Sequence, residues 1–319
     1  MKNCGVFTIS IDVELEWAMH DKPTQLSSHC AIKLEREIVQ RILRLFSKYD
    51  IRATWAVVGN LLSTESNWGG EKANPQNSRS ITGDIKRECF FQHAENYDEP
   101  LRYGRDIIEW IKNASPRQEI GSHSFCHISY NEARTNRDAV RADIASAKKV
   151  HKALDLPFEV FIFPYNMVGY RDLLSKAGVS VYRGVSRRWY YSIPCCSLQR
   201  LLNLLYFIIA VTPPTVTPIV DETGMVNIPD SMLFSARGGC RSLVSSKSLI
   251  KRGLAGLNRA VERGEIFHLW FHPSNFVYKT DEQFYVLEAI LKDAQRLKES
   301  GQLEILTMGD IGNRITKNR

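Results

Sequence analysis

The sequence predicts an α/β fold, a parallel sheet or barrel covered by helices, and three observations support this. Short apolar segments rich in β-branched residues alternate with longer segments of helical periodicity. Strands separated in this way are joined by helical crossovers, which makes neighbouring strands parallel. The 319 residues are 44% hydrophobic and 24% charged, as in an ordinary globular protein. Because no repeat or clean boundary is visible, we predict one domain over residues 1–319.

The first predicted strand is GVFTISI, residues 5–11, because an apolar and β-branched run of this length is typical of a buried parallel strand. Residues 32–50 are predicted to form a helix, since six large side chains lie on one helical face: Leu34, Ile38, Ile42, Leu45, Phe46 and Tyr49. The other predicted strands are 53–59, 118–121, 158–163, 179–183, 225–228, 265–271 and 303–306. The other predicted helices are 104–113, 131–153, 168–177, 246–262 and 281–299.

Two segments interrupt this alternation. Residues 63–100 are polar and too long for a plain connection, so we expect a loop insertion that covers a site. Residues 195–220 form an apolar insertion, in which LLNLLYFIIAV falls short of the roughly 20 residues that span a bilayer. Two interpretations stay open for it: a core helix, or contact with an anionic membrane through 187–211, where arginines and aromatic residues precede the apolar run.

The net charge indicates which binding partners the protein has, and the cysteines indicate its cellular compartment. A formal net charge of +7 favours anionic partners, but the basic residues are dispersed, so we expect no nucleic acid to bind. The seven cysteines are odd in number and include no C-x-x-C pair, which is typical of free thiols in a reducing compartment. The start of the sequence has no signal-peptide pattern. We therefore expect a cytoplasmic protein, or one at the inner face of the membrane.

Polar side chains follow several predicted strands at their carboxyl ends, where catalytic groups of α/β folds gather. Asp12 and Glu14 follow the first strand, His123 and His127 the strand at 118–121, and His272 the strand at 265–271. Two imidazoles and one carboxylate are enough to hold a catalytic divalent ion. Taken singly, the histidines also fit a surface or core pair, and the acids also fit caps of a turn.

Together these segments resemble the motifs of the polysaccharide deacetylases, the NodB-homology group of carbohydrate esterase family 4, over residues 6 to 310. SIDVE resembles the first acidic motif, HSFCH the H-S/T-x-x-H metal motif, FPYN the R-P-P-Y-G loop, and HLWFHPSN the late histidine motif. The resemblance implies a distorted (β/α) barrel with about seven βα units.

The resemblance also implies a role for each matched residue. Asp12 is the catalytic base, the backbone N–H of Tyr165 stabilises the oxyanion, and His272 protonates the leaving amine. One divalent ion, which we expect to be zinc, is bound by Glu14, His123 and His127. His268 and Cys126, although close to these motifs, are interpreted as supporting or structural residues.

The sequence departs from the family pattern at two places. It has Asp-x-Glu where the family has adjacent aspartates, which leaves open which acid binds the metal. It has Ile162 where the family has an arginine that orients the base, and Arg183 is a candidate substitute. We also assign Arg183, Trp55, Asn166 and Asn275 to substrate binding.

The predicted function is a metal-dependent hydrolase that removes an acetyl or formyl group from the nitrogen of an amino sugar. The sugar is an intermediate of cell-surface glycan synthesis, carried by a lipid or a nucleotide. One alternative is a catalytically silent carbohydrate-binding relative, suggested by the missing arginine. Another is a non-haem iron oxygenase, since two histidines and a carboxylate also form its facial triad; that triad usually stands on an antiparallel β framework, unlike the alternation found here.

Overall fold

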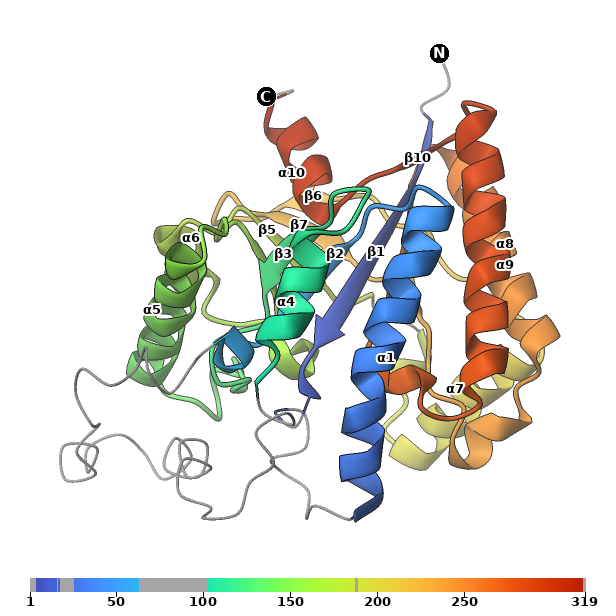
Figure 1. Cartoon of the computed structure of the whole chain (residues 1–319), viewed down its shortest axis with the longest axis horizontal. Coiled ribbons are helices and arrows are strands. Elements are labelled where there is room, and N and C mark those ends of the chain that lie inside the picture. Colours follow the sequence, from blue (N-terminus) through green and yellow to red (C-terminus); the bar gives the residue numbers. More distant parts are fainter. Residues whose placement is uncertain (1–3, 16, 18–25, 63–102, 187–188, 318–319) are drawn as a thin grey trace.

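The structure, a computed structural model, describes residues 4–15, 17, 26–62, 103–186 and 189–317 (Figure 1). The predicted loop insertion at 63–100 lies outside these residues. The predicted α/β fold is confirmed: a curled, largely parallel sheet is covered by helices and forms a distorted barrel.

Strand β1 (Gly5–Val13) lies at the centre of the sheet. On one side it pairs with β9 (Ile266–Phe271), and on the other with β10 (Leu303–Ile305) near its start and β2 (Thr54–Val57) near its end. All three neighbours are parallel to β1. The side chains of β1 alternate, with Phe7, Ile9, Ile11 and Val13 in the main hydrophobic core and Thr8, Ser10 and Asp12 buried on the other face.

The remaining strands extend the sheet from β2 in the order β3 (Glu119–Ser122), β4 (Val160–Ile162), β5 (Val181–Gly184), β7 (Val226–Pro229) and β6 (Ile219–Val220). The β6–β7 pair is antiparallel. At the opposite edge, β8 (Met232–Leu233) pairs with β9. Only Asp230 and Ser231 separate β7 from β8 in the sequence, so the two ends of the curled sheet are brought together and the barrel interior is enclosed.

The described helices lie outside this sheet (Figure 1). They are α1 (Leu26–Lys48), α4 (Arg105–Lys112), α5 (Arg137–Ala153), α6 (Arg171–Ala177), α7 (Cys196–Ile208), α8 (Ser246–Arg263), α9 (Thr280–Glu299) and α10 (Met308–Lys317). Short 3-10 helices follow several strands: η2 (Gly59–Leu62), η6 (Pro164–Asn166), η7 (Trp189–Ser192), η8 (Gly239–Leu243) and η9 (Pro273–Phe276).

Three helix predictions needed correction. Helix α1 begins at Leu26, six residues before the predicted start at 32. Helix α5 begins at Arg137 and not at 131, because the side chain of Asn136 accepts a hydrogen bond from Ala139 N–H and caps the first turn. Helix α10 was not predicted, since Gly309 and Gly312 lower its helix propensity. It forms because Met308 and Ile311 pack into a second hydrophobic cluster with strands β4, β5 and β7.

The apolar insertion forms helix α7 and the segment after it. Two hydrogen bonds fasten this segment to α8: Arg252 donates to the carbonyl of Tyr206 at 2.7 Å, and Ser248 Oγ donates to the carbonyl of Ile208 at 2.9 Å. No helix in the part of the chain that the structure describes has both the length and the apolar character needed to cross a membrane.

Candidate metal and catalytic site

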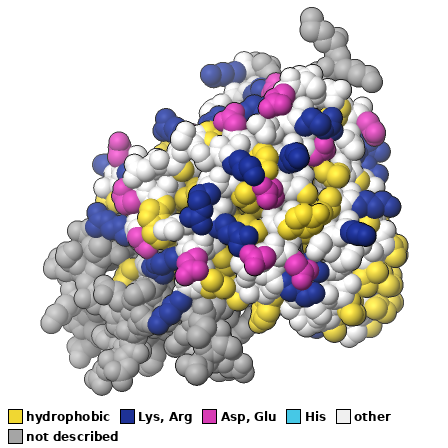
Figure 2. All heavy atoms as spheres, turned by 45° about the vertical axis from the view of Figure 1, so that its right-hand side comes forward, with side chains coloured by type: hydrophobic (Ala, Val, Ile, Leu, Met, Phe, Trp, Pro, Cys, Tyr) yellow, Lys and Arg dark blue, Asp and Glu magenta, His cyan; other side chains and the backbone are white. Residues whose placement is uncertain are grey.

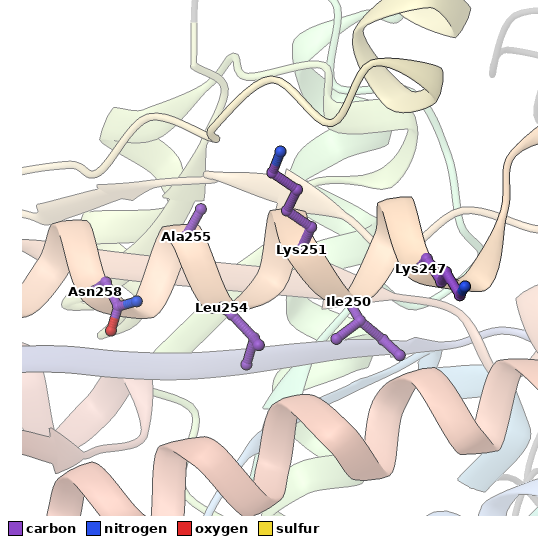
Figure 3. A pocket seen from close by; sticks show the side chains of 6 residues that line it. All are labelled: Lys247, Ile250, Lys251, Leu254, Ala255 and Asn258. Atoms are coloured by element: carbon purple, nitrogen blue, oxygen red, sulfur yellow. The ribbon is translucent and has the colours of Figure 1, made fainter.

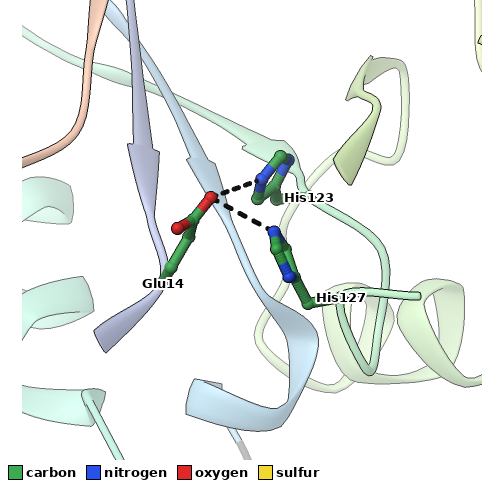
Figure 4. A group of neighbouring side chains, drawn as sticks. All are labelled: Glu14, His123 and His127. Carbon is green, nitrogen blue, oxygen red and sulfur yellow. Dashed lines mark hydrogen bonds and ion pairs between the residues drawn. The ribbon is translucent and has the colours of Figure 1, made fainter. Parts of the chain in front are cut away.

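Three predicted ligands meet at the carboxyl ends of β1 and β3 (Figure 4). Glu14 Oε1 lies 3.0 Å from His123 Nε2 and 3.2 Å from His127 Nε2. One ligand atom from each residue lies within 4.8 Å of the others, and all three side chains are buried. A carboxylate oxygen and two imidazole nitrogens are the donor set of many catalytic zinc sites. The residues therefore fit one divalent ion.

The HSFCH loop brings its two histidines together through an unusual backbone. Ser124 and His127 both have left-handed conformations, with φ of 63° and 55°, which are rare for residues other than glycine. The carboxylate of Asp143, on α5, holds the loop: it accepts hydrogen bonds from the backbone N–H of Phe125 at 3.0 Å and Cys126 at 2.8 Å. The histidines thus converge in a loop fixed by a buried acid, and not on one helical face.

His123 is also oriented by the neighbouring strand. Its Nδ1 lies 2.8 Å from the carbonyl oxygen of Ile162 in β4. In the tautomer that donates this hydrogen bond, Nε2 carries a lone pair and faces Glu14. A backbone carbonyl behind the imidazole is a common way to orient a metal ligand. Ile162 therefore contributes its main chain at the position where the family has an arginine side chain.

The carboxylate of Asp12 is bound at both oxygens by one arginine. Arg183, at the end of β5, donates from Nη1 to Oδ1 at 2.8 Å and from Nη2 to Oδ2 at 2.6 Å. Both side chains are almost completely buried, with 1% and 2% exposed. Burial by itself would raise the pKa of Asp12, but Arg183 beside it lowers that pKa below its usual value. Asp12 is thereby kept ionised and fixed in one orientation.

A buried network positions Arg183 in turn. Its Nη1 also donates to Ser10 Oγ at 3.0 Å, and Ser10 Oγ lies 2.9 Å from His268 Nε2. Burial lowers the pKa of His268 to about 3, so this imidazole is neutral and can accept a hydrogen bond from Ser10. The guanidinium also lies over the ring of Trp270, 4.2 Å from its centroid. These contacts hold Arg183 in place, and Arg183 in turn holds the carboxylate of Asp12.

His272 lies at the end of β9 and is the partly exposed member of the group, with 25% of its side chain accessible. Its Nε2 is 3.2 Å from Glu14 Oε1 and 3.7 Å from Asp12 Oδ2. Burial disfavours the charged imidazolium, but the two carboxylates outweigh this and raise the pKa of His272 to about 9. The imidazole thus faces the carboxylates of Glu14 and Asp12, beside His123 and His127.

Three other predicted site residues, Tyr165, Asn166 and Asn275, contact residues of the site. The side chain of Tyr165 packs against His127, with ring centroids 4.7 Å apart, and its backbone is left-handed. Asn166 accepts a hydrogen bond from Arg183 at 3.0 Å. Asn275 Oδ1 accepts the backbone N–H of His272 at 3.0 Å, so it supports the late histidine motif.

Two of the substrate-binding assignments were wrong. Trp55 is completely buried, packs against Phe46 and donates its indole N–H to Gln118 at 3.1 Å, so a substrate cannot reach it. Strand β2 directs this side chain into the core between the sheet and α1. Arg183 is likewise inaccessible, and its guanidinium is engaged by Asp12, Ser10 and Asn166. It is a positioning residue for Asp12, as the alternative interpretation of the sequence proposed.

Sequence reasoning missed three buried polar residues that support the site. Ser10 was hidden in a run described as apolar, although the alternation TISID sets Thr8, Ser10 and Asp12 on one face. Asp143 and Glu35 lie on helices α5 and α1, and both side chains are buried. The signal for Glu35 was available, because it lies within the predicted apolar face between Leu34 and Ile38.

Comparison with solved structures identifies the fold. A candidate polysaccharide deacetylase from Mycobacterium smegmatis superimposes with a TM-score of 0.64 and 13% sequence identity, covering 99% of this chain and 91% of the other. The chain has the fold of the polysaccharide deacetylases. The PuuE allantoinase superimposes with a TM-score of 0.60 and 12% sequence identity, covering 97% of this chain and 89% of the other. A second candidate deacetylase, from Pseudomonas aeruginosa PAO1, superimposes with a TM-score of 0.58 and 10% sequence identity, with the same coverage of each chain. No family model and no curated protein matches by sequence.

Glu35 makes the stability of the metal-free protein depend on pH. Burial, and then the negative charge of Glu14, raise its pKa from 4.5 to about 8. The folded protein keeps a proton on Glu35 up to about pH 8, whereas the unfolded chain releases it near pH 4.5. The free energy of unfolding therefore falls as the pH rises from 4.5 toward 8, by up to about 1.4 kcal/mol per pH unit. We expect Glu35→Gln to raise the melting temperature at pH 8 and to change it little at pH 4.5.

The matched control is Glu37→Gln, which removes an exposed acid from the same helix. Its effect on the melting temperature should be similar at both pH values. A Glu35→Gln effect that is also independent of pH would show that Glu35 ionises normally in the folded protein.

Proposed function

We propose that this protein is a metal-dependent hydrolase that removes an N-acyl group, acetyl or formyl, from an amino sugar. The observation that carries the proposal is the separation of two acids within one buried site. Glu14 Oε1 lies 3.0 and 3.2 Å from the Nε2 atoms of His123 and His127, whereas both oxygens of Asp12 accept hydrogen bonds from Arg183. One acid is thus placed to hold a metal and the other to move a proton.

A divalent ion held by Glu14, His123 and His127 would supply Lewis-acid polarisation of the amide carbonyl and would make a water molecule more acidic. We expect zinc, because its usual catalytic ligands match this set. Asp12 is the base that takes the proton from water. Its bidentate hydrogen bonds to Arg183 keep it ionised and prevent it from turning toward the metal ligands.

The amine of an amide is a poor leaving group until it is protonated. His272 can donate that proton, because its pKa is raised by the adjacent carboxylates and its side chain is partly open to solvent. A cation held by Glu14 would offset part of that negative charge and would lower the pKa of His272 from this raised value. We also propose that the backbone N–H of Tyr165, beside His127, donates to the oxyanion.

The amino-sugar substrate is supported by the motifs and by the fold shared with candidate polysaccharide deacetylases. We propose that the sugar is linked to a lipid or to a nucleotide, as an intermediate of cell-surface glycan synthesis. The parallel sheet argues against the iron-oxygenase alternative. Arg183 weakens the argument for a silent relative, because the role of the missing arginine is filled from another strand.

The division between the two acids is tested by measuring zinc content and turnover separately. Asp12→Asn should bind zinc normally and lose about 10² to 10⁴ in kcat, since it removes a general base. Glu14→Gln should weaken zinc binding itself. The assay is release of acetate or formate from nucleotide-linked and lipid-linked N-acyl amino sugars, with zinc quantified in the purified proteins.

Glu35→Gln is the matched control, because it neutralises a buried acid near Glu14 that is not a proposed ligand. It should retain zinc. Thermal unfolding is recorded for each variant, since Asp12→Asn leaves Arg183 with a neutral partner. If Asp12→Asn lost zinc and Glu14→Gln kept it, the roles would be reversed.

The role of His272 is tested by changing the leaving group. His272→Ala should lower kcat on an N-acyl amino sugar strongly while zinc content and KM change little, because a leaving-group acid acts mainly in the transition state. On an activated aryl acetate, whose leaving group needs no proton, the loss should be much smaller. His268→Ala is the comparison variant, and its loss of kcat should be the same on both substrates. Equal losses of the His272 variant on both substrates would contradict the assignment.

A further inference from the structure

Helix α7 has an apolar stripe on its outer face. Leu198, Leu201, Leu205 and Ile208 are spaced three, four and three residues apart, which places them on one side of the helix. Their exposed fractions are 41%, 51%, 41% and 37%. The inner face is held by Phe207, which is 3% exposed. A helix that only covered a barrel would have the opposite pattern, with its apolar stripe against the sheet.

Two large aromatic side chains extend this stripe. Trp189 and Tyr191 of η7 are 63% and 48% exposed. Trp189 donates its indole N–H to the hydroxyl of Tyr206 in α7 at 2.6 Å, so the two elements present one surface. We call this surface the α7 face; it consists of Trp189, Tyr191, Leu198, Leu201, Leu205 and Ile208. Trp and Tyr beside aliphatic residues are typical of side chains at the depth of lipid headgroups.

Exposed basic side chains border the α7 face. No acid occurs in the sequence from 184 to 220. Arg200 is exposed on α7 itself. On the adjoining helix α8, the exposed residues Lys247 and Lys251 border a shallow hollow of about 440 Å³ whose apolar lining includes Ile250 and Leu254 (Figure 3).

Helix α7 lies at the lower right of Figure 1, and Figure 2, which is turned by 45° from that view, shows hydrophobic side chains gathered at its lower right. We propose that the α7 face docks on an anionic membrane surface, with the aliphatic stripe in the headgroup region and the basic residues against lipid phosphates. A second copy of the chain is a poorer occupant. A symmetric contact would bring Arg200, Lys247 and Lys251 of each copy against the same basic rim of the other.

The α7 face is connected to the candidate site through the chain that follows β5. Element η7 begins a few residues after β5, whose Arg183 binds Asp12. Ser186, between them, donates its backbone N–H to Asp230 at 2.7 Å, and Asp230 also accepts the indole N–H of Trp270 at 3.2 Å. The segment that leads to the α7 face is thus linked, through Asp230 and Trp270, to the arginine that binds Asp12. Given the proposed function, this favours a lipid-linked amino sugar over a nucleotide-linked one.

Vesicle flotation tests the docking without using metal or turnover. We expect the wild-type chain to float with vesicles of phosphatidylcholine and phosphatidylglycerol and to bind vesicles of phosphatidylcholine alone at least about tenfold more weakly. Replacing Leu198, Leu201, Leu205 and Ile208 by Ser should leave the protein in the bottom fraction. Tyr285→Ser, an exposed aromatic residue on α9, is the control and should float.

The basic rim is tested in the same assay. Lys247→Glu with Lys251→Glu should reduce binding to anionic vesicles by roughly fivefold per charge removed. Lys148→Glu with Lys152→Glu has the same spacing on α5 and should have little effect. Circular dichroism confirms folding of each variant, and light scattering gives its oligomeric state.

Wild-type protein that stays in the bottom fraction with anionic vesicles would overturn the proposal. So would a dimer that is abolished by the four serine substitutions, since a second copy would then cover the α7 face. Flotation without hydrolysis of any N-acyl sugar would leave the docking intact and contradict the proposed function alone.

Discussion

The buried ion pair between Asp12 and Arg183 is the constraint on which the candidate site depends. Two charged groups with almost no exposure are tolerated because both carboxylate oxygens accept hydrogen bonds from one guanidinium. Removing one partner of such a pair typically costs about 3–5 kcal/mol, because the other charge is left buried. Arg183 and Asp12 also join strands β5 and β1, which lie several strands apart in the sheet. The pair thus links two strands across the barrel and holds the carboxylate of Asp12 in one orientation.

Fixing Asp12 decides the chemistry of its neighbours. Arg183 engages both oxygens of Asp12, and Glu14 is the acid whose oxygen lies near His123 and His127. The carboxylates of Glu14 and Asp12 raise the pKa of His272, so one cluster contains an acid whose pKa is lowered, an imidazole whose pKa is raised and three side chains that fit a divalent ion. Functional pairs of groups are often created by environments that push their pKa values apart. Here a single arginine, placed by the fold, supplies much of that difference.

Much of the fold was predictable, because buried strands and amphipathic helices have strong periodic patterns. Glu14, His123 and His127 were predictable as a group because the carboxyl ends of parallel strands meet. Trp55 was wrongly assigned to substrate binding because the alternation of side chains along a strand does not show which of its two faces lies toward the site. Asp143 was invisible, since its role depends on a loop whose left-handed residues, Ser124 and His127, have no signature in sequence. The Arg183 pairing required knowing that β5 lies across the barrel from β1.

The central claim is that Arg183 reserves Asp12 for proton transfer and leaves Glu14 to the metal. Anomalous X-ray diffraction from zinc-soaked crystals at the zinc absorption edge tests it most directly. We expect an ion at about 2.0–2.2 Å from a Glu14 oxygen and from one nitrogen each of His123 and His127, with Asp12 still bound to Arg183. An ion coordinated by Asp12, with Arg183 displaced from it, would show that Asp12 and not Glu14 is the metal-binding acid.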